Sequence, residues 1–256
     1  MTIKNSVRFN YAGIDSEDYG LINVSYDISL PDEPFISERD IEVSQSAGRD
    51  DTYFIDVVNL PLVIDLHFAF KYGFGKNHEY LTEVSRWLNQ DYYQPLIFSE
   101  QPNRIYYCMC DGDTELIHNQ AGAGLISLTM RNMDNYARSQ FYISDIYESI
   151  SDVNIYNWGD VELKPIIYIE MLEDMNIFTL LNTNNLTKLE FRELQSGDEI
   201  FVDLNHKIVE AENNNTKIYL YDNLKDSSLL FDVGENHITA SMGDWRLRFK
   251  YQYKFL

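Results

Sequence analysis

Apolar and polar residues alternate with a period of two along most of this 256-residue chain. Successive side chains of a strand point to opposite faces of a sheet, so this alternation predicts strands with one buried face. Short alternating pieces at regular spacing, separated by turn residues, are typical of β-sandwiches and barrels. We therefore predict a mainly β fold. The clearest stretches are 62–72, 104–110, 165–171, 186–194 and 245–255.

One stretch, residues 76–89, has a helical period instead. Leu81, Val84, Trp87 and Leu88 lie at the spacing that places them on one face of an α-helix. Asn77 is a suitable residue to cap the helix start. We expect a single helix here.

The alternation fades between about residues 135 and 160 and then resumes in shorter pieces. We place a domain boundary after residue 150, which predicts an N-terminal domain at 1–150 and a C-terminal domain at 151–256. Hydrophobic residues make up 45% of the chain, which is enough for well-formed cores.

The formal net charge is −21, and such a chain repels a phosphate backbone, so sequence-specific nucleic-acid binding is not expected. No apolar run approaches the roughly 20 residues of a membrane-spanning helix. The first residues lack the basic and apolar regions of a signal peptide, which predicts synthesis in a cytoplasm.

No residue set points to catalysis. The five histidines are scattered without metal-binding spacing, and neither a phosphate-binding loop nor a nucleophile elbow occurs. Cys108 and Cys110 are interpreted as small apolar residues of a strand. "DGDTE", Asp111 to Glu115, begins like a calcium loop but lacks the later ligands, so we interpret it as a tight hairpin turn. We predict no enzyme activity, no metal and no cofactor.

The last alternating stretch carries its cations on one face. Two interpretations are open: a solvated outer face, which is the simpler one, or a contact with an acidic neighbour. The four residues of this candidate interface are Arg246, Arg248, Lys250 and Lys254.

The opening "FNYAGIDSEDYGLINVSYDI" holds an acidic turn between two alternating runs. Gly13 and Gly20 can adopt the unusual backbone angles that turn ends require. Asp15, Ser16 and Asp18 can hydrogen-bond to their own backbone, so the turn needs no metal.

This opening also resembles the first hairpin of the distal tail proteins of siphophages that infect Gram-positive bacteria. Their pattern F-x-Y-x-G, then x-S-x-D-x-G-L, is carried here by Phe9, Tyr11, Gly13, Ser16, Asp18, Gly20 and Leu21. Further on, "SAGRDD" is similar to that family's G-R-D-G turn, with Gly48 and Arg49 in place and Asp51 where a second glycine is usual. "SGDEIFVDL" is similar to a C-terminal hairpin of the family, through Gly197 and Asp198.

The resemblance implies a structural virion protein at the distal end of the tail, the baseplate hub. Its N-terminal domain would be β-barrel-like, with one helix and an extended hairpin, and would close a homohexameric ring that lets DNA pass. Its C-terminal domain would be a galectin-like β-sandwich. Implied partners are the tail tube protein, the tail-tip or tail-associated lysin protein and, in some phages, a receptor-binding protein.

A carbohydrate-binding module that contacts the host cell wall is the alternative function. Exposed aromatic side chains would favour it. Trp158 and Gly159 match part of the galectin sugar-binding pattern, but they precede the sandwich that we expect from Val161 onward, and the rest of the pattern is absent. We therefore do not assign sugar binding on this pattern.

Overall fold

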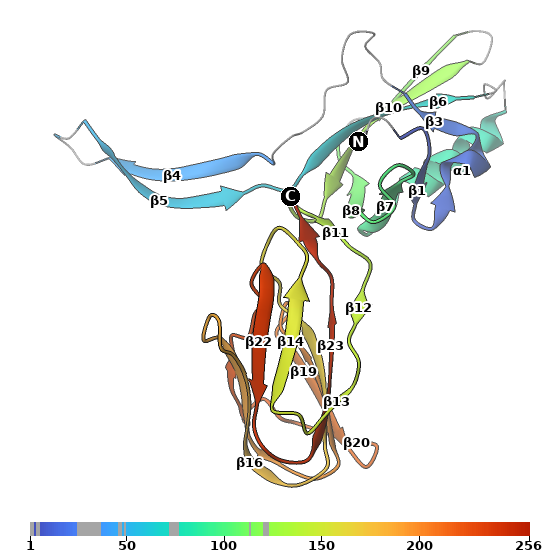
Figure 1. Ribbon diagram of the computed structural model, residues 1–256. Helices are drawn as coiled ribbons and strands as arrows, with labels where there is room; N and C mark the ends of the chain where they lie inside the picture. The colour runs from blue at the N-terminus through green and yellow to red at the C-terminus, as the bar shows by residue number, and fades with distance from the viewer. Residues whose placement is uncertain are drawn as a thin grey trace. The chain divides into compact units, whose positions relative to one another are not determined.

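A computed structural model describes residues 3, 6–24, 37–45, 48, 50–71, 77–112, 114–119 and 123–256 of the chain (Figure 1). Contacts within the chain divide it into two compact units, Met1–Arg138 with Leu256, and Ser139–Phe255. The division lies inside the stretch where the alternation fades and ahead of residue 150. The short strands β12 (Tyr142–Ile143) and β13 (Tyr147–Glu148) cause this difference, because both pair with β23 (Trp245–Tyr251) of the second unit.

The N-terminal unit is built on one antiparallel sheet in the order β2-β1-β7-β8-β10-β6-β3. Strand β9 also pairs with β10, and β11 with β8. The bounds are β1 Phe9–Tyr11, β2 Ile14–Asp15, β3 Leu21–Asn23, β6 Val63–Phe70, β7 Gln94–Phe98, β8 Ile105–Cys110, β9 Glu115–His118, β10 Gly124–Asn132 and β11 Ala137–Arg138.

Helix α1 (His78–Leu88) packs its apolar face against this sheet. Asn77 caps it as predicted, because its Oδ1 accepts hydrogen bonds from the backbone N–H of Glu79 at 3.1 Å and of Tyr80 at 3.2 Å. The ring of Trp87 stacks on Phe9 with centroids 5.8 Å apart, and Phe9 stacks in turn on Phe68 of β6 at 4.2 Å. These aromatic contacts join helix α1, strand β1 and strand β6 into one core.

Strands β4 (Arg39–Gln45) and β5 (Thr52–Asn59) form a separate two-stranded hairpin of the N-terminal unit (Figure 1). Their side chains are exposed, apart from the partly buried Val57. This is the extended hairpin that the family resemblance predicted.

The C-terminal unit is a β-sandwich of two antiparallel sheets around a shared core. One sheet has the order β12-β23-β15-β18-β19-β20, with β13 also on β23; the other has the order β14-β22-β16-β17-β21. Trp245 and Phe249 of the first sheet pack against Phe178 and Phe231, and all four rings are fully buried. The remaining bounds are β14 Asp152–Asn157, β15 Ile166–Met171, β16 Met175–Asn182, β17 Lys188–Leu194, β18 Asp198–Asp203, β19 Ile208–Asn213, β20 Thr216–Ile218, β21 Leu224–Ser227, β22 Gly234–Ala240 and β24 Lys254–Phe255.

The fold class is confirmed: mainly β, with a helix-bearing first unit, an extended hairpin and a sandwich. Three details differ from the sequence prediction. The runs that flank the acidic turn do not pair with each other, since β1 pairs with β2 and β7 while β3 pairs with β6. "DGDTE" does not close a hairpin, because the strands on either side of it, β8 and β9, both pair with β10. The last strand breaks after Tyr251, before β24.

Candidate functional site

The acidic turn of the N-terminal unit is a compact structural element. Residues Ser16–Tyr19 form a 3-10 helix whose start is capped by Asp15, which accepts a hydrogen bond from the Glu17 backbone N–H at 2.9 Å. Gly13 and Gly20 have φ of 81° and 55°, in the left-handed region that favours glycine. Ser16 is fully buried and its hydroxyl accepts from the backbone N–H of Phe9 instead of closing its own turn.

The other two turn motifs lie in different elements. Gly48, with φ of 88°, belongs to the segment between β4 and β5, and Arg49 lies outside the described residues. Gly197, with φ of 87°, precedes β18, and the buried carboxylate of Asp198 accepts from the backbone N–H of Gln195 and from Asn213 Nδ2, both at 2.8 Å. The β18–β19 hairpin that this motif predicted is present.

One face of the β4–β5 hairpin is mainly apolar, and the opposite face carries carboxylates beside the exposed Tyr53 and Val58. Ile41 lies opposite Val57 and Val43 opposite Phe54, whereas Glu42 lies opposite Asp56 on the other face. The register shifts between Glu42 and Val43, which leaves Ile55 as the extra residue of a bulge. The alternation within 39–45 and 52–59 was a usable signal for this surface, but we did not predict the surface from it.

In β23 the alternate residues Arg246 and Arg248 are exposed, whereas Trp245, Leu247 and Phe249 are buried in the core. Arg246 is satisfied within the unit, since its Nε donates to Glu148 at 3.0 Å and its Nη1 lies 3.3 Å from Glu170. These pairs raise the pKa of the Arg246 guanidinium, through the hydrogen bond to Glu170 first.

The other three cations have different surroundings. Lys250 Nζ lies 4.5 Å from the centroid of the Phe141 ring. Arg248 is exposed and forms no ion pair with any described residue. Lys254 lies apart from them, in β24. The structure thus brings Arg246, Arg248 and Lys250 together on β23 and leaves Lys254 elsewhere.

A groove of about 790 Å³ opens over the outer face of this sheet. Its lining includes Arg248, Tyr168, Phe201 and Glu210, which lie directly opposite one another in register across β23, β15, β18 and β19. Along this row the groove passes from a cation over two aromatic rings to a carboxylate.

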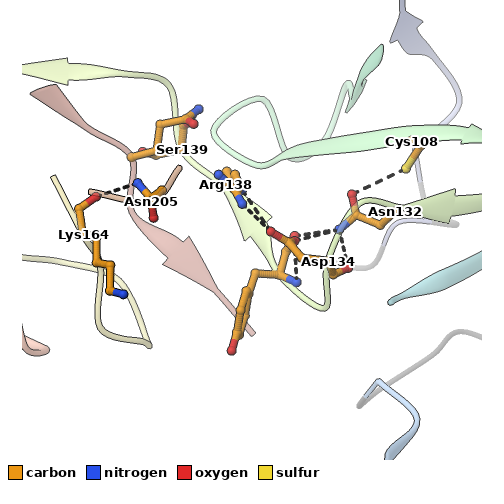
Figure 2. Close-up of polar contacts among 9 residues, drawn as sticks. Cys108, Asn132, Asp134, Arg138, Ser139, Lys164 and Asn205 are labelled. Atoms are coloured by element: carbon orange, nitrogen blue, oxygen red, sulfur yellow. Dashed lines mark hydrogen bonds and ion pairs between the residues drawn. The ribbon is translucent and has the colours of Figure 1, made fainter. Parts of the chain in front are cut away.

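The cysteines lie in a structural cluster of the N-terminal unit. Burial, followed by the nearby charge of Asp134, raises the pKa of the Cys108 thiol, which keeps it protonated and unreactive. Figure 2 shows Asn132 beside it, with its amide donating to the Asp134 carbonyl at 3.0 Å, while Arg138 pairs with the Asp134 carboxylate. These contacts close the turn between β10 and β11.

Two features are absent from the described part of the chain. No group of three or more His, Cys, Asp or Glu side chains there is placed to hold a metal ion. Among the same residues, no helix is both long enough and apolar enough to cross a bilayer.

The known proteins that are similar to this chain in sequence or fold come from phages or a prophage. The "SPbeta prophage-derived uncharacterized protein YomH" of Bacillus subtilis (strain 168) is 27% identical over 256 residues, which are 99% of this chain and 100% of that protein. The crystal structure of the Dit protein (gp 19.1) of phage SPP1 superimposes with a TM-score of 0.71 at 12% identity, covering 96% of this chain and 98% of that one. A chain of the phage p2 baseplate, in its activated conformation with Sr, gives a TM-score of 0.50 at 9% identity over 97% and 99% of the two chains.

The family described as "Phage tail protein N-terminal domain" matches residues 4–134. This match covers more than half of the chain and coincides closely with the helix-bearing N-terminal unit. The fold is that of a phage distal tail protein, as the opening motifs predicted. The chain thus belongs to the family of phage tail proteins that share this N-terminal domain.

Proposed function

We propose that this protein is a non-enzymatic structural component of a virion, the hub at the distal end of a phage tail. In this role it forms a homohexameric ring that joins the tail tube to the tail-tip protein and lets DNA pass. The family match and the likeness to the SPP1 protein, which is described as a hub adsorption apparatus, support the proposal.

In this proposal the exposed apolar face of the β4–β5 hairpin is the surface that contacts a neighbouring subunit during ring assembly. Val43 and Phe54 are 52% and 67% exposed although they lie opposite each other in one ladder. A two-stranded hairpin is at best marginally stable in water, and exposed apolar patches of this kind mark protein contacts. Docking on a neighbouring subunit would cover this face and stabilise the hairpin.

The test compares ring formation by hairpin variants, using light scattering and negative-stain images with the tube protein present. Val43→Ser with Phe54→Ser should reduce the ring population about tenfold or more, since each change removes roughly 1–2 kcal/mol of apolar burial from every contact. Circular dichroism should remain that of the folded chain. Glu42→Gln with Ser44→Ala changes the opposite face and should leave assembly unchanged.

A ring population that is the same in the Val43/Phe54 variant and in the Glu42/Ser44 variant would contradict the assigned docking face. A wild-type chain that stays monomeric at every salt and protein concentration, with its tube protein present, would contradict the hub proposal itself.

A further inference from the structure

Tyr156 and Trp158 form an exposed aromatic pair in the C-terminal unit. Their ring centroids lie 4.0 Å apart, and the residues are 45% and 67% exposed. Both follow the outward register of β14, whose alternate residues Val153 and Ile155 are buried in the sandwich core. Trp158 therefore extends a sandwich strand, which corrects our expectation that this tryptophan precedes the sandwich.

The backbone around Trp158 is held in place on both sides. The buried Asn157 accepts a 2.9 Å hydrogen bond from the Gly159 N–H and donates one of 2.9 Å to the Val161 carbonyl. A Cβ on Gly159 would lie 2.6 Å from the Lys254 carbonyl oxygen, so this position admits only glycine without backbone movement. The tryptophan is thus presented from a fixed backbone, and its binding would cost little ordering entropy.

A cluster of polar side chains adjoins the aromatic pair on β22. Glu235 lies directly opposite Tyr156, and His237 directly opposite Asn154. The His237 Nδ1 lies 2.6 Å from Asn154 Oδ1, and Asn184 accepts from the His237 backbone N–H at 3.1 Å. Asn184 also donates to the Glu235 carbonyl at 3.0 Å. We call the five residues Asn154, Tyr156, Trp158, Glu235 and His237 the aromatic platform.

We infer that the aromatic platform binds a neutral pyranose unit of a surface polysaccharide. A pyranose offers an apolar ring face, which suits a tryptophan–tyrosine surface, and a rim of hydroxyl groups, which suits amide, carboxylate and imidazole partners. The carboxylate of Glu235 and the net charge of −21 disfavour an anionic polymer. This inference goes beyond the hub role and does not require the ring.

The chain supplies its own control for exposed aromatic residues. Tyr219 and Tyr221 form a second pair in the same unit, with centroids 5.4 Å apart and Tyr219 68% exposed. The Tyr221 hydroxyl is occupied by the Val209 backbone N–H at 2.9 Å, and this pair lacks the cross-strand cluster of β14 and β22. Tyr219→Ala therefore removes an equally exposed ring without touching the platform.

Tryptophan fluorescence of the full chain reads out the platform directly. The chain has three tryptophans, and Trp87 and Trp245 are 3% and 0% exposed, so a ligand that shifts the emission acts on Trp158. The probes are a tetramer of N-acetylglucosamine, cellotetraose and poly(glycerol phosphate). The two neutral probes distinguish an aminosugar polysaccharide from a glucose polysaccharide, and the third probe represents an anionic polymer.

We expect one neutral tetramer to shift the emission with a dissociation constant in the millimolar range. Calorimetry should then show binding at least about tenfold weaker for Trp158→Ala and Glu235→Gln, retained for Trp158→Phe, and unchanged for Tyr219→Ala. The inference is overturned if neither neutral tetramer binds, if only poly(glycerol phosphate) binds, or if Trp158→Ala binds like the wild type. Loss of ring assembly in Trp158→Ala without any glycan binding would identify the pair as a protein contact and also overturn it.

Discussion

Trp87 donates its indole N–H to the backbone carbonyl of Tyr11 over 2.8 Å, which fastens helix α1 to the first strand of the chain. Both residues are almost completely buried. The family motif around Tyr11 is thus held by Trp87, in the last turn of helix α1, and the two sequence signals describe one packed contact.

Replacing Trp87 by Phe should lower the free energy of unfolding by about 1–3 kcal/mol, because it leaves the buried Tyr11 carbonyl without its donor. Trp87→Ala should cost about 3–5 kcal/mol, since it also opens a cavity in the aromatic core. Urea denaturation followed by circular dichroism measures both values. Arg86→Ala, on the exposed face of the same helix, should stay within about 0.5 kcal/mol of the wild type. Equal effects at positions 86 and 87 would contradict the contact.

Two glycine-to-alanine changes should differ for a physical reason. At Gly13 no atom lies within 4 Å of an added Cβ, so Gly13→Ala meets only the left-handed backbone at φ of 81°, a cost of about 1–2 kcal/mol. At Gly159 the added Cβ meets a backbone oxygen at 2.6 Å, which cannot move like a side chain, so the cost should reach about 3 kcal/mol. Thermal unfolding of the two variants tests this order, and the reverse order would refute the close approach at Gly159.

The Asp203 carboxylate should make stability depend on pH in the acid range. Burial acts to raise its pKa, but the hydrogen bonds from His206, with Nδ1 at 2.7 Å and the backbone N–H at 3.2 Å, outweigh burial and lower it. A carboxyl whose folded pKa is depressed stabilises the fold above its unfolded pKa of about 3.9, and this contribution is lost as the pH falls through the folded value.

Asp203→Asn should therefore be less stable than the wild type at pH 7, by about 1–3 kcal/mol, and the difference should shrink below about pH 4. Denaturant unfolding across pH measures it. Asp222→Asn changes an exposed carboxylate of the same unit and should give a pH-independent difference near zero. A constant deficit for Asp203→Asn at every pH would show that the carboxylate charge has no role.

Ring assembly should improve with added salt. Each subunit carries a net charge of −21, and ions screen exposed charges over a Debye length of about 8 Å at physiological ionic strength. Light scattering at rising salt concentration, at constant protein concentration, checks this. A ring population that falls as salt rises would mean that attractive charge pairs dominate the subunit contacts.

The cations of β23 provide a related test of acidic partners. Arg248→Glu with Lys250→Glu should weaken assembly without unfolding the chain, because Arg248 is exposed and forms no ion pair with any described residue. Arg246→Glu should instead lower stability, because Glu148 and Glu170 lose their partner. Unchanged ring mass in the double variant would support the simpler interpretation of a solvated face.

Several elements of the fold could be predicted from local sequence patterns. The helix was predicted at 76–89 and observed at 78–88 with the expected Asn77 cap, because its apolar spacing and its cap act within a few residues. The buried face of β6 was predicted for the same reason, since side chains in a strand alternate between faces.

Strand pairing and assembly surfaces were harder to predict. The run around "DGDTE" has the residues of a tight turn, yet β8 and β9 on either side of it pair with β10 and not with each other. A turn signal in the sequence does not reveal which strands pair. The hairpin bulge at Ile55 depends on the register between β4 and β5, which one strand's sequence does not contain. Three of the four candidate cations lie on β23 and Lys254 lies on β24, and the ion pairs of Arg246 involve residues 98 and 76 positions away in sequence.

The β class, the single helix, the exposed cations of β23 and the resemblance to tail proteins could all be predicted from the sequence, because periodicity and turn chemistry are local properties of the chain. The fold was needed to show that Arg246 has ion-pair partners while Arg248 has none among the described residues, and that Tyr156 lies opposite Glu235 on a neighbouring strand. These contacts join residues far apart in the sequence, and they exist only once the strands have paired in one register.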